Sequence, residues 1–168
     1  MKTTLIALVA LFFPIIVFCQ DITGLWTGTM YNEVTKKYLP YEVFISKDKG
    51  KYTGFSKTIF LIAGDQYYGI KKMKVDIAKD GKIILLDAGM IKNDYPIENK
   101  NVRQLNVLDF VNKANETELN GLFVTNQTKV YAEVTGKVNL KRVSSYGESS
   151  LMQYLKINNN DKDITAVK

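Results

Sequence analysis

The segment Ile22–Tyr31 reads ITGLWTGTMY. Ile22, Trp26 and Met30 stand at even spacings, so they share one face of an extended strand, while threonines occupy the opposite face. The chain contains one tryptophan, and it lies in this segment. We therefore predict a β-strand over Gly24–Tyr31 that places the tryptophan on the buried face of a sheet.

Seven further segments show a similar pattern, with turn signals about every 10–14 residues. They are predicted as strands at Tyr41–Ser46, Tyr52–Ile62, Tyr67–Ile77, Ile83–Ile91, Arg103–Val111, Glu118–Thr125 and Lys129–Val143. Short hairpin turns join most of them, including the Gly-containing turns at 47–50 and 79–82. Parallel strands need long crossovers, so these short turns predict antiparallel neighbours in meander order. The longest connection, Lys92–Val102, is a lid, a binding loop or simply mobile.

Glycine recurs inside most of the predicted strands. The positions are Gly24, Gly28, Gly54, Gly69, Gly89, Gly121 and Gly136. Glycine weakens a strand unless it marks a bulge, a bend or a close approach of backbones. A strongly coiled sheet needs such positions to close on itself. We therefore predict an all-β fold, an antiparallel eight-stranded barrel, with a β-sandwich as the alternative.

A short helix is predicted after the strands, over about Glu148–Ile157. Ser145 and Glu148 have the S-x-x-E spacing of a capping box. An apolar face at helical spacing follows, formed by Leu151, Tyr154 and Leu155. We expect this helix to pack across one mouth or side of the sheet. The predicted organisation is a signal peptide at 1–19, a barrel domain at 20–143, a C-terminal helix at 144–157 and a flexible tail at 158–168.

The first nineteen residues have the anatomy of an export signal. Lys2 precedes Leu5–Phe18, an apolar run of about 14 residues, shorter than the ~20 residues of a bilayer-spanning helix. In one interpretation cleavage follows Cys19, and a soluble periplasmic or extracellular chain starts at Gln20. In the other, Cys19 is lipidated and the protein is an outer-membrane lipoprotein. Lipidation is the only membrane attachment that we expect.

The composition excludes several classes of site. The chain has no histidine and one cysteine, which rules out a Ser-His-Asp triad, a Cys-His dyad, a His/Cys zinc site and an internal disulfide. No phosphate-binding loop or EF-hand loop is present, so we expect no cofactor, no metal and no enzymatic activity. The formal net charge is +6, but only Arg103 and Arg142 among 23 basic residues are arginines. Scattered lysines without arginine clusters argue against nucleic-acid binding.

Gly24-Leu25-Trp26 at the first strand, with Lys141 and Arg142 ending the last, resembles the calycin pattern of lipocalins, fatty-acid-binding proteins and avidins. The chain also looks like small exported proteins of unknown role in Gram-negative bacteria. The calycin resemblance implies a barrel closed at one end by Gly24, Trp26 and Arg142, with the guanidinium stacked on the indole.

An eight-stranded barrel either fills itself with side chains or holds one small ligand. We predict an apolar inward set consisting of Trp26, Tyr41, Val43, Ile45, Met73, Val75, Leu105, Val107, Phe123, Val138 and Leu140. The first functional hypothesis is an exported carrier of one small apolar ligand, bound by Tyr41, Val43, Met73, Val75, Leu105 and Phe123. The alternative is an envelope-associated interaction or structural protein with a filled barrel. Its contacts with a cell-envelope protein or glycan would use exposed tyrosines at loop ends, namely Tyr31, Tyr38, Tyr67, Tyr68 and Tyr95.

Overall fold

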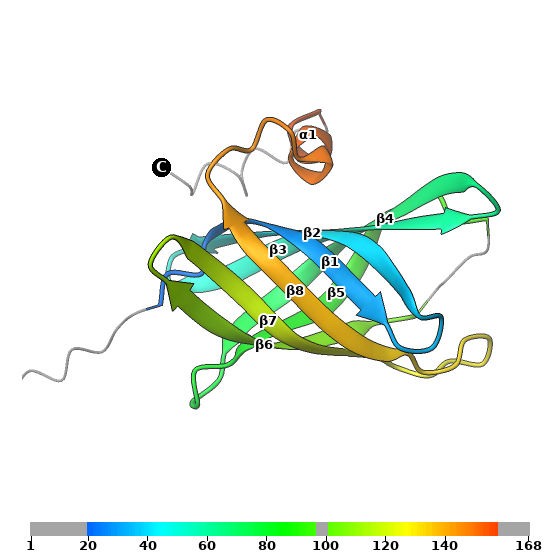
Figure 1. The fold of residues 1–168 in the computed structure, drawn as a ribbon, viewed down its shortest axis with the longest axis horizontal. Helices are drawn as coiled ribbons and strands as arrows, with labels where there is room; N and C mark the ends of the chain where they lie inside the picture. Colours follow the sequence, from blue (N-terminus) through cyan, green and yellow to red (C-terminus); the bar gives the residue numbers. More distant parts are fainter. Residues whose placement is uncertain (1–19, 97–100, 158–168) are drawn as a thin grey trace, which may run out of the picture.

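The computed structural model describes residues 20–96 and 101–157. In this part of the chain, eight antiparallel strands close into a barrel in sequence order, and one short helix follows them (Figure 1). The strands are β1 (Gly24–Asn32), β2 (Lys37–Asp48), β3 (Lys51–Ile62), β4 (Asp65–Ile77), β5 (Ile83–Asn93), β6 (Gln104–Lys113), β7 (Glu116–Thr125) and β8 (Thr135–Val143), and the helix is α1 (Ser150–Ile157). The predicted meander barrel is confirmed, and the sandwich alternative is wrong.

Three predicted features lie wholly or partly outside the described residues. They are the signal peptide with Cys19, the tail at 158–168 and part of the long connection between β5 and β6.

The last strand begins at Thr135, so the prediction of Lys129 as its first residue is wrong. Residues 126–134 form a connection instead. The Thr128 hydroxyl accepts a hydrogen bond from the Tyr131 amide at 2.9 Å, and the Thr128 amide donates to the Tyr131 carbonyl at 2.9 Å. A threonine side chain that bonds to nearby backbone in this way favours a turn over a strand.

The barrel has two unlike ends. We call the end that carries Trp26 the closed end, where the chain enters β1. We call the other end the mouth. It carries the β1–β2, β3–β4, β5–β6 and β7–β8 connections, and the tip of the β3–β4 hairpin projects beyond the barrel wall there (Figure 1).

Trp26 lies fully buried at the closed end. Its indole N–H donates to the Ile22 carbonyl at 3.0 Å, and its ring meets Phe110 edge to face, with 6.2 Å between centroids. Gly24 begins the strand with a φ of 115°, in the left-handed region that favours glycine. The chain therefore turns sharply into β1, and the indole ring of Trp26 lies across the interior of the barrel.

Arg142 completes the closed end from the last strand. Trp26 and Arg142 are directly opposed in the β1–β8 pairing, and the guanidinium carbon lies 4.8 Å from the centroid of the indole. The guanidinium also donates to the Asp21 carbonyl. The structure thus brings together Gly24, Trp26 and Arg142, the three residues that the calycin resemblance placed at one end of the barrel.

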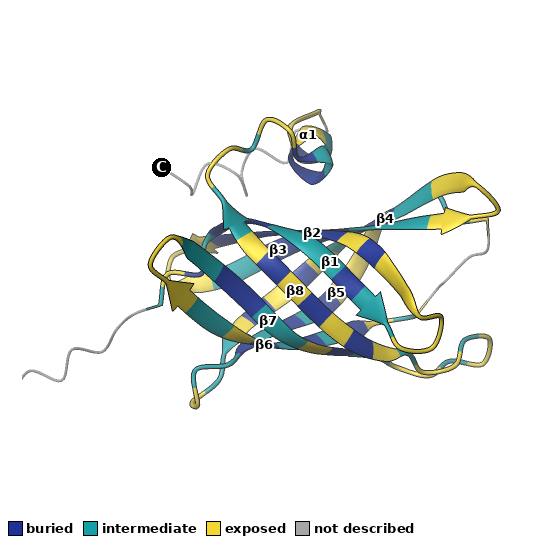
Figure 2. Cartoon of the chain, viewed as in Figure 1, coloured by how far each residue is buried: buried dark blue, intermediate teal, exposed yellow. Residues whose placement is uncertain are grey.

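Side chains fill the barrel interior. The interior cluster consists of Ile22, Trp26, Met30, Leu39, Tyr41, Val43, Ile45, Met73, Val75, Ile83, Leu85, Leu108, Leu119, Phe123, Val138 and Leu140. Figure 2 colours buried positions dark blue along the strands. Most of the side chains in this cluster are 0% exposed. A void large enough for a water molecule would leave accessible surface on the side chains that line it. The closed-end half of the barrel is therefore solid.

Close strand approach inside the barrel requires glycine at two positions. A Cβ on Gly28 would lie 2.1 Å from the Asn139 carbonyl oxygen, and one on Gly136 would lie 1.9 Å from the Tyr31 carbonyl oxygen. Both glycines lie on the β1–β8 seam that closes the sheet. Their missing side chains allow the strong coiling that closure needs.

Helix α1 packs on the outside of the barrel and covers one side of the wall. Its buried residues meet outward-facing side chains of the first four strands. This second cluster consists of Leu25, Phe44, Phe55, Ile70, Leu151, Met152 and Leu155. Outward apolar residues on β1–β4 therefore belong to the interior of the protein, although they lie outside the barrel.

The helix begins at a different cap from the predicted one. The Ser149 hydroxyl accepts from the Met152 amide at 3.1 Å, so Ser149 is the N-cap, and the capping box predicted at Ser145 and Glu148 is wrong. The reason lies in β2. Glu42 accepts from the Leu151 amide at 2.8 Å and from the Ser149 and Ser150 hydroxyls at 2.7 and 3.2 Å. A carboxylate is stabilised at the positive end of a helix, so Glu42 fixes where α1 starts.

Replacing Trp26 with alanine is expected to lower the free energy of unfolding by about 3–5 kcal/mol, because truncation of a buried Trp leaves a cavity. Urea unfolding followed by circular dichroism measures this. Tyr38→Ala is the matched control, since that aromatic is 68% exposed, and it should change stability little. Equal stability of the two variants would contradict closure of the barrel by Trp26.

Candidate functional site

The structure divides the residues that the sequence assigned to a ligand site. Tyr41, Val43, Met73, Val75 and Phe123 lie in the interior cluster. Leu105 does not: it lies on the outer face of β6, and the prediction that Leu105 and Val107 point inward is wrong. Along this strand the buried side chains are Gln104, Asn106 and Leu108.

Buried polar groups on β6 can face inward because they bond to each other and to backbone. The Asn106 amide donates to the Leu85 carbonyl at 3.2 Å and accepts from the Gln104 side chain at 2.7 Å. A buried polar group costs little when its hydrogen bonds are made. The aliphatic Leu105 and Val107 consequently take the outer face, the reverse of the pattern expected for a solvated strand.

An ion pair lies inside the mouth half of the barrel. The Lys71 ammonium lies 2.5 Å from the Asp87 carboxylate, whose side chain is only 4% exposed. The same carboxylate oxygen accepts from the Gln104 backbone amide at 2.8 Å. Asp87 therefore joins β5 to β6 by a side chain just where their backbone pairing stops, since the two strands pair only up to Leu86 and Leu105.

Two tyrosines flank this ion pair, the buried Tyr41 and the half-buried Tyr95. Burial raises the pKa of the Tyr41 hydroxyl, and the nearby Asp87 carboxylate raises it further. Burial likewise raises the pKa of Tyr95, with Asp94 and Asp87 acting in the same direction. A raised pKa keeps both phenols protonated at neutral pH.

Tyr95 covers the mouth from the β5–β6 connection. Its ring meets Phe60 edge to face, with centroids 4.7 Å apart. A Cβ on Gly69 would lie 2.9 Å from the Tyr95 hydroxyl oxygen, so glycine at this position makes room for the ring. The polar cluster of Tyr41, Lys71, Asp87, Gln104 and Asn106 thus lies beneath an aromatic cover.

The charges in this cluster cancel, and its hydrogen bonds are made within the barrel wall. Lys71 and Asp87 neutralise each other, and Gln104 and Asn106 bond to their neighbours.

In the ranges 20–96 and 101–157, no group of three or more acidic or sulfur ligands is placed to hold a metal ion. No helix within the same ranges has the length and apolar character needed to cross a bilayer.

Exposed apolar side chains gather at the mouth. Seven of the nine large hydrophobic residues that are exposed in the described part of the chain lie on its hairpins and strand ends: Val34, Tyr38, Leu61, Ile62, Met90, Ile91 and Val130. Clusters of exposed hydrophobic side chains mark interaction sites. The hairpin tips around the mouth are therefore the strongest candidate contact surface at either end of the barrel.

The five tyrosines predicted at loop ends do not form one cluster. Tyr31 and Tyr38 stack on the β1–β2 hairpin with centroids 4.8 Å apart. Tyr68 lies on the side of the wall near α1, where the Lys57 ammonium is 4.3 Å from its ring centroid. Burial lowers the pKa of that lysine. Tyr95 is the mouth cover described above. Sequence reasoning found the tyrosines but missed the aliphatic hairpin tips beside them.

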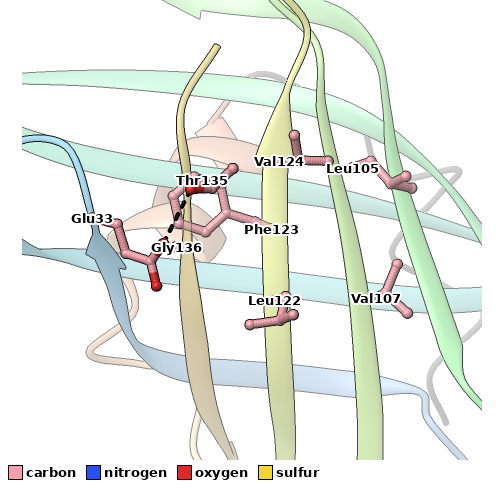
Figure 3. A pocket seen from close by; sticks show the side chains of 8 residues that line it. All are labelled: Glu33, Leu105, Val107, Leu122, Phe123, Val124, Thr135 and Gly136. Atoms are coloured by element: carbon pink, nitrogen blue, oxygen red, sulfur yellow. Dashed lines mark hydrogen bonds between the residues drawn. The ribbon is translucent and has the colours of Figure 1, made fainter.

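A groove of about 300 Å³ lies along the wall of the barrel, lined mostly by outward-facing side chains. Figure 3 shows its lining on β6, β7, β8 and the β1–β2 connection. The lining residues are Glu33, Leu105, Val107, Leu122, Phe123, Val124, Thr135 and Gly136. Glu33 and Thr135 are joined across its edge by a 3.1 Å hydrogen bond. Leu122 protrudes here with 60% of its side chain exposed.

Comparison with protein-family models, with curated proteins and with solved structures finds no match for this chain.

Asp87→Leu is expected to cost about 3–5 kcal/mol of stability, because it leaves a buried ammonium uncompensated and an amide without its acceptor. Adding Lys71→Met should recover part of that loss, since the double variant buries no unpaired charge. Urea unfolding of both variants and of the wild type measures the difference. A double variant that is less stable than Asp87→Leu alone would show that the two residues do not neutralise each other.

Proposed function

We propose that this protein is a non-enzymatic interaction module, in which a filled barrel serves as a rigid scaffold and the mouth hairpins contact a protein partner. The observation that carries this proposal is the gathering of exposed apolar side chains at the mouth, above a barrel whose closed-end half is solid. This is the filled-barrel alternative of the sequence analysis.

Burial of the interior supports the filled barrel over the carrier. A carrier needs an enclosed apolar space, commonly about 300–1,000 Å³ for a small-molecule site. Here Val43, Leu85 and Val138, which would line such a space, have no accessible surface. Apolar residues that a carrier would turn toward its ligand are instead exposed on the hairpin tips.

The character of the exposed residues supports a protein as the partner. Tyr38 is paired with Tyr31, and tyrosine supplies large contact area at low entropic cost. Leu61 and Ile62 stand on the projecting tip of the β3–β4 hairpin, 66% and 43% exposed. Aliphatic and aromatic tips of this kind suit an apolar protein groove better than a glycan.

We further propose a calycin-like barrel that acts outside the cytoplasm. The Gly24, Trp26 and Arg142 arrangement at the closed end supports the calycin proposal. The apolar run Leu5–Phe18 behind Lys2 supports export to the periplasm or beyond, with lipidation of Cys19 as the route to an outer-membrane lipoprotein.

A second candidate function is binding of one small uncharged molecule at the mouth. It is favoured by the polar groups of Lys71, Asp87 and Gln104 beneath Tyr95, where the aromatic cover would have to move aside. Because the ammonium is already neutralised by a carboxylate, a charged ligand would lack an opposite charge there.

The test is site-specific photo-crosslinking in the native host. A photoreactive residue at Leu61 or at Tyr38 is expected to give discrete protein adducts. The same residue at Ile157, which is 80% exposed at the end of α1, is the matched control and should give none. Adducts of equal yield at all three positions, or at none, would contradict a contact surface at the mouth.

A further inference from the structure

We propose that the outer face of β6–β8 is the interface of a two-fold symmetric homodimer, formed by a second copy of this chain. This surface lies on the side of the barrel and adjoins the mouth only at its edge, where Glu33 belongs to the β1–β2 connection. The proposal does not depend on the function proposed above. It rests on the arrangement of outward-facing side chains around the groove of Figure 3.

Two parallel rows of aliphatic side chains cross this face. Strand pairing aligns Ile84, Val107 and Leu122 in one row. It aligns Leu86, Leu105 and Val124 in the next row, nearer the mouth. On β5 and β6 these side chains alternate with buried neighbours, and on β7 they stand on either side of the buried Phe123, so both rows lie on the outer surface of the wall. Such a face resembles the apolar core of a protein interface.

In the proposed dimer the two copies pack face to face, related by a two-fold axis that runs perpendicular to the strands and midway between the two rows. This axis places each row of one copy against the other row of the second copy. Every strand of one copy then meets the same strand of its partner, running in the opposite direction. Aliphatic side chains face aliphatic side chains along the whole contact. The symmetry also makes a prediction about charge. A charged residue beside one row faces the residue that lies beside the other row in the second copy, so the two residues should carry opposite charges.

The charges on β6 pass this test. Arg103 is exposed at the mouth side of the two rows, and Asp109 is exposed at the closed-end side. From Arg103, the residue just before β6, the alternate positions thus read Arg103, Leu105, Val107 and Asp109. Because the β6 strands of the two copies run in opposite directions, Arg103 of each copy lies opposite Asp109 of the other. Within the described residues Asp109 pairs with the exposed Lys82 at 2.7 Å, an ion pair worth little in solvent.

The charges along β8 pass it as well. Lys137 is opposite Leu122 in the row nearer the closed end. Glu33 lies at the other row, where its carboxylate accepts from the Thr135 hydroxyl. The two-fold axis brings Lys137 against Glu33 of the second copy. At the far edge of the face, Lys74 and Asp76 are opposite Leu86 and Ile84 and have the same self-complementary order.

This pattern favours a second copy over a membrane. Both signs of charge rim the aliphatic rows, and an anionic lipid surface would repel Glu33, Asp76 and Asp109. Opposite charges at symmetry-related places are instead what fixes the register of a self-complementary interface.

The test is sedimentation equilibrium of the purified protein and of charge variants. Wild type is expected to dimerise. Arg103→Asp and Asp109→Arg should each weaken the dimer by about tenfold or more, because each places like charges opposite one another twice. An equimolar mixture of these two variants should form heterodimers, since every contact then pairs an arginine with an aspartate. Arg103 and Asp109 of one chain are about 20 Å apart along the strand, so contact within a chain cannot explain such rescue.

Two leucine variants provide the matched control. Leu122→Asp should abolish the dimer, and Leu61→Asp, at similar exposure on the β3–β4 hairpin, should leave it intact. Circular dichroism and thermal unfolding check that both variants keep the fold. A wild-type protein that remains monomeric at all concentrations, or variants that fail to associate with each other, would overturn the proposal.

Discussion

The interior of a closed eight-stranded barrel is just wide enough for its own side chains or for one small ligand, and this narrow space governs the rest of the structure. At the closed end Trp26 fills this space: its ring reaches from β1 to Phe110 on β6 and is held by Arg142 and by the Ile22 carbonyl. At the β1–β8 seam, Gly28 and Gly136 allow the strands to approach closely, which the narrow barrel requires. Once this space is full, every further apolar side chain must be covered from outside or left exposed.

The outward apolar residues are handled differently on different sides of the wall. On β1–β4 they are covered by α1, whose position Glu42 fixes by accepting hydrogen bonds at the start of the helix. On β5–β7 no part of the described chain covers them as α1 does, and they form the two rows around the groove. At the mouth they occupy the tips of the hairpins. A barrel that is solid in its closed-end half and has two uncovered apolar surfaces is consistent with the contact function that we propose.

The sequence was sufficient for the fold because local signals and the global arrangement agree. Short hairpin turns and interior glycines indicated an antiparallel meander that coils strongly, and the barrel has that order. Gly24, Trp26 and Arg142 also met as the resemblance implied. These features depend on residues close in sequence or at the two ends of the run of strands.

The remaining features depend on contacts between distant strands, which alternation cannot reveal. On β6 the alternation predicted that the aliphatic residues Leu105 and Val107 are buried. Asn106 faces inward instead, because the Leu85 carbonyl on the neighbouring strand β5 accepts its hydrogen bond. Lys71 faces inward because Asp87 neutralises it. The cap of α1 was misplaced because part of it comes from β2. The apolar mouth and the charge order across the outer wall became visible only when the strand register was known.

Native mass spectrometry of the protein purified from its own host tests the filled barrel most directly. The account predicts that each chain has the same mass under native and denaturing conditions, because the interior holds only its own side chains. An excess mass that disappears on denaturation would mean that a small molecule occupies the barrel, and would contradict the account.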